Sequence, residues 1–320
     1  MEQTIRTASG LVAAGLLAPG REREVAAVAT RYAIAVTPTV AALMDREDPA
    51  DPIARQYLPD AAELTTAPWE IDDPTADAPF TPLKGVVHRY PDRALLKPLL
   101  ACPVYCRFCF RREVVGPGGG MLTDPELEAA LDWFARTPTV TEAILTGGDP
   151  LMLSPRRLTQ IVARLSAVPH LQLIRLHSRV PVADPGRITP ALVAALETEK
   201  ALFLCVHANH AREFTAEAGV ALRRLNRSGA VLLGQSVLLR GINDTTEALE
   251  ALFRTMLHYR IKPYYLHQLD AAPGTARFAV PPEEGLRLVA SLRGRVTGLA
   301  WPTYVVESPN GGGKRLVTAS

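Results

Sequence analysis

Short apolar runs alternate with amphipathic stretches along most of the chain after residue 93. Each apolar run is followed by a turn signal and then by a stretch with helical periodicity. This order is typical of βα units whose strands pair in parallel. The pattern predicts six such units. The strands are expected at residues 94–100, 142–145, 171–176, 202–206, 231–238 and 263–269.

The stretches between the predicted strands have the periodicity and the start signals of helices. Thr123 with Glu126, Ser154 and Asp244 are expected to cap helix starts. Six βα units predict an α/β fold, a partial (β/α)6 TIM-like barrel with its functional loops at the carboxyl ends of the strands. The helices are expected at residues 124–136, 155–167, 190–197, 213–227, 246–258 and 282–293.

Two further regions flank the barrel, which we place at residues 83–298. Residues 1–82 form an N-terminal accessory region with helical composition at 21–36 and 41–45. Within it, residues 65–82 are polar and rich in proline, as in a linker or a wrapping segment. Residues 299–320 form a short C-terminal segment that begins with the apolar run 303–306.

Charge and length exclude some classes of partner. The net charge of the 320-residue chain is +2, so no broad basic field favours a nucleic acid. No apolar stretch reaches the length needed to cross a membrane. The chain shows no secretory leader, and we expect it in the cytoplasm.

Three of the four cysteines lie within Cys102-Pro-Val-Tyr-Cys106-Arg-Phe-Cys109, a C-x3-C-x2-C run. Thiolates are the usual ligands of iron–sulfur clusters, and three of them leave one iron of a four-iron cube open to a substrate or cofactor. A zinc site is the alternative, but it generally needs a fourth ligand, and no second cysteine pair is present. A disulfide framework fits a large chain of this kind less well. Cys205 lies in an apolar run and is expected to be a buried core residue.

Polar motifs lie at or near the carboxyl ends of five consecutive predicted strands, after the cysteine run that follows the first one. One such motif is typical of an ordinary loop, but five in register favour a shared cleft. The motifs are Thr146-Gly-Gly-Asp-Pro150, His177-Ser-Arg179, His207-Ala-Asn-His210, Gln235 and Gln268-Leu-Asp270.

The C-terminal run Gly311-Gly-Gly-Lys314 carries one of only five lysines. A lysine amine forms Schiff bases with pyridoxal phosphate, and glycines let the backbone approach a ligand closely. Arg89 and Arg93, four residues apart, are suited to a phosphate group. The alternatives are a solvated lysine on a glycine-rich tail and two arginines in surface ion pairs.

These motifs together resemble the lysine 2,3-aminomutase family of radical S-adenosylmethionine enzymes. The resemblance extends from about residue 38 to residue 318. The segments that carry it are Asp48-Pro-Ala-Asp-Pro52, His88-Arg-Tyr-Pro-Asp-Arg93, residues 102–112, Thr146-Gly-Gly-Asp149, Ser178-Arg-Val-Pro181, Arg187-Ile-Thr189, residues 235–244, Lys262-Pro-Tyr-Tyr265 and Gly311-Gly-Gly-Lys314.

The resemblance implies three cofactors and a set of residues that hold them. A 4Fe-4S cluster is expected on Cys102, Cys106 and Cys109. Pyridoxal phosphate is expected on the catalytic Lys314, with Arg89, Tyr90 and Arg93 around it. The residues expected near S-adenosylmethionine are Gly147, Gly148, Asp149, Ser178, His207 and Gln235.

The implied reaction moves an amino group of an amino acid from C2 to C3. Arg111 is expected to hold the substrate carboxylate, and Asp270 with Glu307 a distal cation. A buried pair of carboxylates favours a basic substrate, and lysine is expected first. The family's lysine enzymes have Asp where this chain has Glu307. A branch that serves elongation factor P modification is similar to this chain in having Glu there.

Three alternatives stay open: arginine or another basic amino acid as the substrate, lysine chemistry for elongation factor P, and a non-catalytic iron–sulfur protein that transfers electrons or binds a partner. The expected partners are the substrate and an electron donor such as flavodoxin or ferredoxin. We also expect a homo-oligomer.

Overall fold

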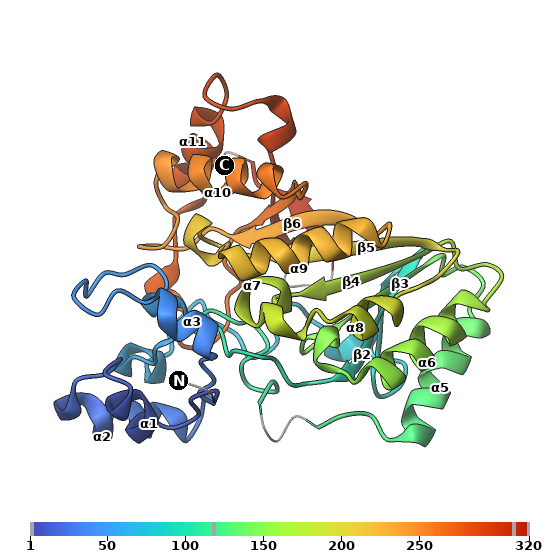
Figure 1. Ribbon diagram of the computed structural model, residues 1–320, viewed down its shortest axis with the longest axis horizontal. Helices are drawn as coiled ribbons and strands as arrows, with labels where there is room; N and C mark the ends of the chain where they lie inside the picture. Colours follow the sequence, from blue (N-terminus) through green and yellow to red (C-terminus); the bar gives the residue numbers. More distant parts are fainter. Residues whose placement is uncertain (1–2, 117–119, 309–311, 319–320) are drawn as a thin grey trace.

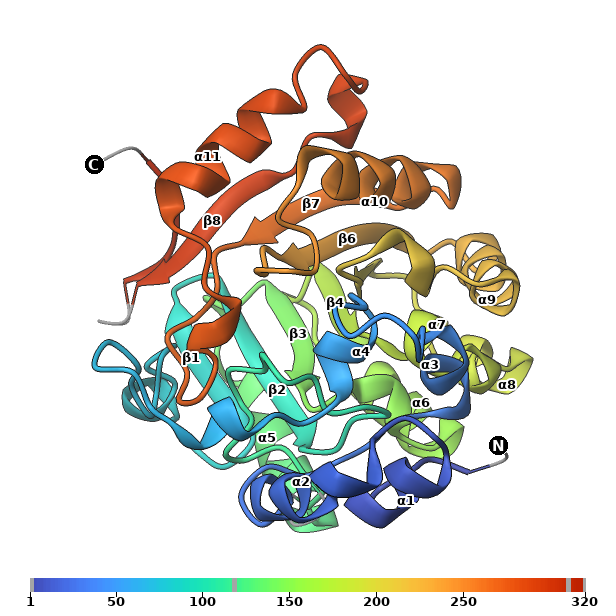
Figure 2. The same ribbon diagram turned by 90° about the vertical axis from the view of Figure 1, so that its left-hand side faces the viewer.

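A nine-stranded sheet curves into an almost closed barrel in the computed structural model, which describes residues 3–116, 120–308 and 312–318 (Figures 1 and 2). Its strands are ordered in space as they are in the chain. All pairs from β2 to β8 are parallel, whereas the edge strands β1 and β9 run antiparallel to their neighbours. The strands are β1 (Val86–Tyr90), β2 (Arg93–Leu99), β3 (Glu142–Gly147), β4 (Leu173–Ser178), β5 (Ala201–His207), β6 (Val231–Val237), β7 (Lys262–His267), β8 (Thr303–Ser308) and β9 (Gly313–Leu316).

The predicted α/β barrel and its six strands are confirmed as β2–β7, with boundary shifts of a few residues. The count of parallel strands is corrected to seven. The apolar run expected in the C-terminal segment is β8, which pairs in parallel with β7 through Tyr265 and Thr303. The barrel sheet therefore continues past residue 298. Strand pairing of this kind depends on residues that are distant in sequence, so the local pattern did not reveal it.

Successive side chains of a barrel strand point alternately to the core between the sheet and the outer helices and to the interior of the barrel. Leu96, Leu145 and Leu176 are paired across β2, β3 and β4, and all three are fully buried in the core that includes the surrounding helices. Their neighbours Arg175 and His177 point to the opposite face and are only partly covered. Because successive side chains of a strand alternate between faces, this register places polar groups inside the barrel.

The outer helices agree with the pattern except at some of their ends and except for the four-residue helix after β4, which the pattern did not predict. They are α5 (Asp124–Ala135), α6 (Pro155–Ser166), α7 (Val180–Ala183), α8 (Pro190–Ala194), α9 (Ala216–Arg227), α10 (Thr246–His258) and α11 (Pro282–Ser291). Thr123 and Glu126 form the expected capping box, and Ser154 caps α6. The expected Asp244 cap is wrong, because the side chain of Thr245 accepts the N–H of Ala248 at the start of α10. Asp244 instead accepts from the backbone N–H of Gly241.

The N-terminal region packs over the end of the barrel to which the strands run (Figure 2). Its helices are α1 (Ala8–Ala13), α2 (Glu22–Ala29), α3 (Pro38–Leu43) and α4 (Ala54–Tyr57). They share an apolar cluster that also contains Val104 of the loop after β2 and Ala183 of α7. The helix expected at residues 21–36 is shorter, because α2 ends at Ala29 and Val36 then pairs with Ile5 in a β-bridge.

Residues 65–82 wrap around the loop that follows β7. The carboxylate of Glu70 accepts the backbone N–H groups of Gly274, Thr275 and Ala276, at 2.7 to 3.0 Å. The backbone N–H of Ile71 donates to the carbonyl of Ala271. These contacts tie the accessory region to the carboxyl end of the barrel. None of the described helices combines the length and apolar character needed to cross a membrane.

Candidate functional site

The loop after β2 brings its three cysteines to one small cavity. Cys102, Cys106 and Cys109 all line a space of about 40 Å³, and none of the three is in a disulfide. Burial raises the pKa of all three thiols, that of Cys106 to about 11. Three thiols around one cavity fit the predicted cluster, whose cysteines bind different irons. Among the described residues, no group of three or more His, Cys, Asp or Glu side chains is arranged to hold a single metal ion.

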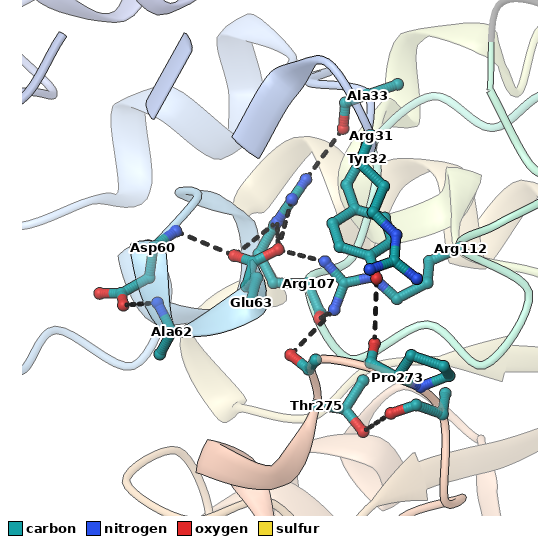
Figure 3. Close-up of polar contacts among 12 residues, drawn as sticks. Arg31, Tyr32, Ala33, Asp60, Ala62, Glu63, Arg107, Arg112, Pro273 and Thr275 are labelled. Atoms are coloured by element: carbon teal, nitrogen blue, oxygen red, sulfur yellow. Dashed lines mark hydrogen bonds and ion pairs between the residues drawn. The ribbon is translucent and has the colours of Figure 1, made fainter. Parts of the chain in front are cut away.

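A buried carboxylate from the accessory region fixes this cysteine loop. Glu63 accepts hydrogen bonds from Arg107 and Arg112, which flank Cys109 (Figure 3). It also accepts one from Arg277. The guanidinium of Arg112 also lies 3.6 Å from the centre of the Tyr32 ring. A carboxylate that is fully buried among three cations is costly to remove, since the cations lose their counter-charge. The position of the two arginines inside the cysteine motif was the only sequence signal of this cluster.

The turn after β3 packs directly on the cysteine loop. A side chain at Gly148 would lie 2.3 Å from the carbonyl oxygen of Ala101, so only glycine fits there. The carboxylate of Asp149 accepts from the hydroxyl of Ser178 and from the backbone N–H groups of Arg179 and Val180, at 2.6 to 3.1 Å. Three of the residues predicted near S-adenosylmethionine, Gly148, Asp149 and Ser178, thus lie together. Their role toward that cofactor stays a prediction.

His207 and Gln235 are direct neighbours on β5 and β6. The His207 ring packs edge-on against Phe108, with 5.9 Å between ring centres. Burial and the charge of Arg179 hold its pKa well below the usual value, so the imidazole is neutral. Its Nε2 is buried without a partner among the described residues, as expected of a group that awaits a ligand.

Lys314 on β9 points at the carboxylate of Glu307 on β8. Its Nζ lies 2.9 Å from Glu307 Oε1, and Arg89 Nη1 lies 3.4 Å from the same oxygen. The backbone N–H of Lys314 donates to the hydroxyl of Tyr90 at 2.6 Å. These contacts join β1 to β8 and β9, the two edges of the sheet. Gly311 of the predicted glycine run lies outside the described residues.

Arg89 and Arg93, the predicted phosphate ligands, have different surroundings. Arg93 stacks on the Tyr90 ring at 3.6 Å and pairs with the neighbouring Asp92. Arg89 instead points at Asp77 and Glu307, with its side chain 7% exposed. The two arginines therefore share no ion-pair partner among the described residues.

Asp77 gathers three cations beside the predicted substrate site, and the sequence analysis did not single it out. Its carboxylate pairs with Arg89 at 2.9 Å, Arg111 at 3.1 Å and Lys97 at 3.4 Å. Although burial alone would raise its pKa, Arg111 and Lys97 hold that pKa below the usual value. Arg111 Nε is buried and has no hydrogen-bond partner among the described residues.

Asp270 lies in the same electrostatic neighbourhood. Burial, and then the negative charge of Glu307, raise its pKa to about 7, while Lys314, Arg111 and Arg89 act in the opposite direction. The structure therefore brings the three predicted substrate residues and the predicted cofactor lysine close enough to influence one another. Such a carboxyl is poised to bind a cation near neutral pH.

Two histidines inside the barrel are part of this neighbourhood and were missed as site residues. Burial lowers the pKa of His177 and His267, that of His267 to about 3, and the charge of Lys314 lowers both further. Nε2 of each ring is buried without a partner among the described residues. Only the position of His177 at the end of a predicted strand was a sequence signal.

Sequence relatives identify the family to which this site belongs. L-lysine 2,3-aminomutase from Clostridium subterminale is 38% identical over 296 residues, which cover 92% of this chain and 71% of that protein. L-lysine 2,3-aminomutase from Bacillus subtilis is 34% identical over 314 residues, 98% of this chain and 67% of that protein. The chain belongs to the lysine 2,3-aminomutase family. It is accordingly an isomerase of the aminomutase type.

The family also includes a relative with a different named substrate. Glutamate 2,3-aminomutase from Clostridioides difficile is 33% identical over 287 residues, 90% of this chain and 68% of that protein. Among solved structures, a radical SAM methyltransferase from Sphaerobacter thermophilus matches 72% of each chain, with a TM-score of 0.49 and 21% identity. No family model matches the chain.

Proposed function

We propose that this chain is a radical S-adenosylmethionine aminomutase that converts L-lysine to β-lysine by moving its amino group from C2 to C3. The observation that carries the substrate class is the pair of acids Asp270 and Glu307 beside Lys314. Burial first, and then the negative charge of Glu307, raise the pKa of Asp270, which supports mutual repulsion of the two carboxylates. A substrate cation between them would relieve that repulsion, and this favours a basic amino acid.

The chain has residues suited to the cluster, to S-adenosylmethionine and to pyridoxal phosphate. Cys102, Cys106 and Cys109 would hold the cluster, and the neighbourhood of Gly148, His207 and Gln235 would hold S-adenosylmethionine. Lys314 would carry pyridoxal phosphate, beside Tyr90, Arg89 and Arg93. When bound, these groups supply a carbon-centred radical able to take an unactivated hydrogen and a carbonyl carbon that holds the migrating nitrogen.

The protein's own groups would bind and orient the substrate. Arg111 would bind the substrate carboxylate, while its Nη2 donates to Asp77 and its buried Nε has no partner among the described residues. Correct placement of the reacting carbon is worth several orders of magnitude in rate. Arg111 at one end and the two acids at the other would provide it.

Charge balance links the lysine to the substrate cation. Nζ of Lys314 is the ammonium that Glu307 contacts at 2.9 Å. If Nζ of Lys314 holds pyridoxal phosphate, Glu307 no longer has the lysine ammonium as a partner. The distal ammonium of a lysine substrate would take its place, so the same carboxylate is neutralised before and after substrate binding.

Other substrates and roles are possible outcomes of the incubation experiment described below. Arginine would satisfy the two acids by the same charge argument, and lysine chemistry for elongation factor P modification is compatible with Glu307. The electron donor is proposed to be a flavodoxin or ferredoxin, the protein is proposed to act in the cytoplasm, and a homo-oligomer is expected. A non-catalytic iron–sulfur protein would leave Lys314 without a role.

The test is anaerobic reconstitution with iron, sulfide, S-adenosylmethionine, pyridoxal phosphate and reductant, followed by separate incubation with lysine, arginine and glutamate. β-Lysine as the main product supports the proposal. Product from glutamate alone would contradict the role of the acids, and no product together with no 5′-deoxyadenosine would contradict the aminomutase assignment.

Two variants examine the cofactor residues with matched controls. Cys106→Ala should lose bound iron, whereas Cys205→Ala, which removes a buried thiol elsewhere, should keep it. Lys314→Ala should abolish isomerisation and keep the cluster, whereas Lys84→Ala, at an exposed ion pair, should be active. Full iron in Cys106→Ala would overturn the ligand assignment.

A further inference from the structure

The guanidinium of Arg179 contacts the sulfur of Cys106. Arg179 follows β4, and its Nη1 donates to Cys106 Sγ at 3.2 Å. The side chain is almost fully buried, 6% exposed. No role was assigned to this arginine from the sequence, and the proposed reaction does not use it directly. A charged donor on the sulfur of a predicted cluster ligand points to a role in tuning that ligand.

The rest of the guanidinium is fixed by two other side chains. Nη2 lies 2.7 Å from Glu213 Oε2 and 2.5 Å from Gln56 Oε1. Glu213 is itself held, because its Oε1 accepts the backbone N–H groups of Asn209 and His210 at 2.7 and 2.9 Å. Arg179 therefore cannot turn away from the sulfur without breaking a buried ion pair.

The other two cysteines of the motif have a different kind of neighbour. Burial raises the pKa of Cys102 and Cys109, whereas hydrogen bonds from the backbone N–H groups of Asp149 and Arg111, respectively, lower it, as do the charges of Arg111 and Arg112 at Cys109. A backbone amide carries only a partial charge. Among the contacts of the described residues, Cys106 is thus the cysteine of the three whose sulfur accepts a hydrogen bond from a fully charged side chain.

We propose that Arg179 raises the reduction potential of the cluster by donating this charged hydrogen bond to Cys106. The inference rests on the proposed function, in which Cys106 is a cluster ligand. Hydrogen bonds to the sulfurs and local net charge are two of the levers that set such potentials. A fixed positive charge stabilises the reduced cluster, which carries one more negative charge than the oxidised cluster.

The redox step itself is a transfer of one electron. A low-potential one-electron donor, such as dithionite in the laboratory, is oxidised by one electron and the cluster is reduced by one. No bond forms or breaks in that step, and no proton is transferred. Arg179 makes the acceptance of this electron more favourable.

Removing the charge of Glu213 should shift the midpoint potential of the cluster in the opposite direction. Its carboxylate offsets part of the positive charge of Arg179, so its removal should expose the cluster to more of that charge. Glu213→Gln keeps a carbonyl oxygen that can accept the two backbone N–H groups. A residue pair that only supported the fold would not shift the potential in opposite directions.

The experiment is a redox titration of the anaerobically reconstituted protein, followed by the electron paramagnetic resonance signal of the reduced cluster. Arg179→Gln is expected to lower the midpoint potential, Arg179→Lys to lower it less, and Glu213→Gln to raise it. The matched control is Arg212→Gln, which removes a neighbouring cation that pairs with the carboxylate of Asp51. Its potential should equal that of the wild type.

The outcomes separate this inference from the proposed function. An Arg179→Gln protein with full iron and an unchanged potential would overturn the inference alone. If that variant fails to retain iron, Glu213→Gln decides, and an unchanged or lowered potential in it overturns the inference. A wild-type protein that binds no cluster would instead overturn the proposed function.

Discussion

The backbone N–H of Lys314 donates a 2.6 Å hydrogen bond to the hydroxyl of Tyr90 and so joins the two edges of the barrel sheet. The two residues lie on β9 and β1, which are not neighbours in the sheet order. Gly313 makes this approach possible, because it adopts a φ of +74° and the Tyr90 ring lies against its Cα. The predicted cofactor lysine is thus placed by a contact between the two edge strands of the sheet, β1 and β9.

Gly313→Ala should displace Lys314. An added Cβ would lie 2.3 Å from the Tyr90 oxygen, at a backbone conformation that alanine rarely adopts. We expect loss of bound pyridoxal phosphate, measured by its visible absorbance, and a lower melting temperature. Gly298→Ala, where nothing lies within 4 Å of the added Cβ, is the control and should behave as the wild type. Normal cofactor content in Gly313→Ala would refute the proposed placement.

Glu63→Ala should be strongly destabilising. It would leave Arg107, Arg112 and Arg277 buried without their shared carboxylate, a change that costs about 3–5 kcal/mol when one partner of a buried pair is removed. The free energy of unfolding from denaturant titration measures the effect. The control is Glu128→Ala, in a solvent-exposed ion pair with Arg164, for which we expect at most about 1 kcal/mol. Equal effects in the two variants would contradict the role of Glu63.

Asp270 should make the folded protein less stable as the pH rises from about 4 to about 7. Burial and Glu307 raise its pKa from 3.8 to about 7 in the folded state, so over that range the folded protein keeps a proton that the unfolded chain has released. The free energy of unfolding then falls with increasing pH. Melting temperatures measured across this range should fall more steeply in the wild type than in Asp270→Asn. Parallel pH profiles would show that Asp270 has no raised pKa.

Asp77→Asn should weaken the ligand-free protein and increase its response to anions. The change removes the negative charge shared by Arg89, Lys97 and Arg111, so the three cations repel each other more strongly. We expect a lower melting temperature without ligand and a larger increase on addition of inorganic phosphate. Asp92→Asn, at an exposed pair with Arg93, is the control and should follow the wild type. An unchanged response to phosphate in Asp77→Asn would exclude this cluster as an anion site.

Local patterns predicted much of the barrel, because the information for a strand, a helix or a cap lies within a few residues. The six βα units and the caps at Thr123 and Ser154 followed from periodicity and start signals. The Asp244 cap was wrong by one residue, since two adjacent polar side chains both qualify and only the backbone geometry selects Thr245. Motif spacing likewise singled out the three cysteines and Lys314.

The chemical groups of the chain and its six central strands with their helices could be recognised from local sequence patterns. Which groups meet depends on the folded chain, because charges and hydrogen bonds act through space between residues that no spacing rule connects. Arg89 and Glu307 lie 218 positions apart and share an ion pair, and Asp77 reaches three cations from a segment without regular periodicity. The orientation of Arg179 toward Cys106 depends in the same way on Gln56 and Glu213, which come from different parts of the chain.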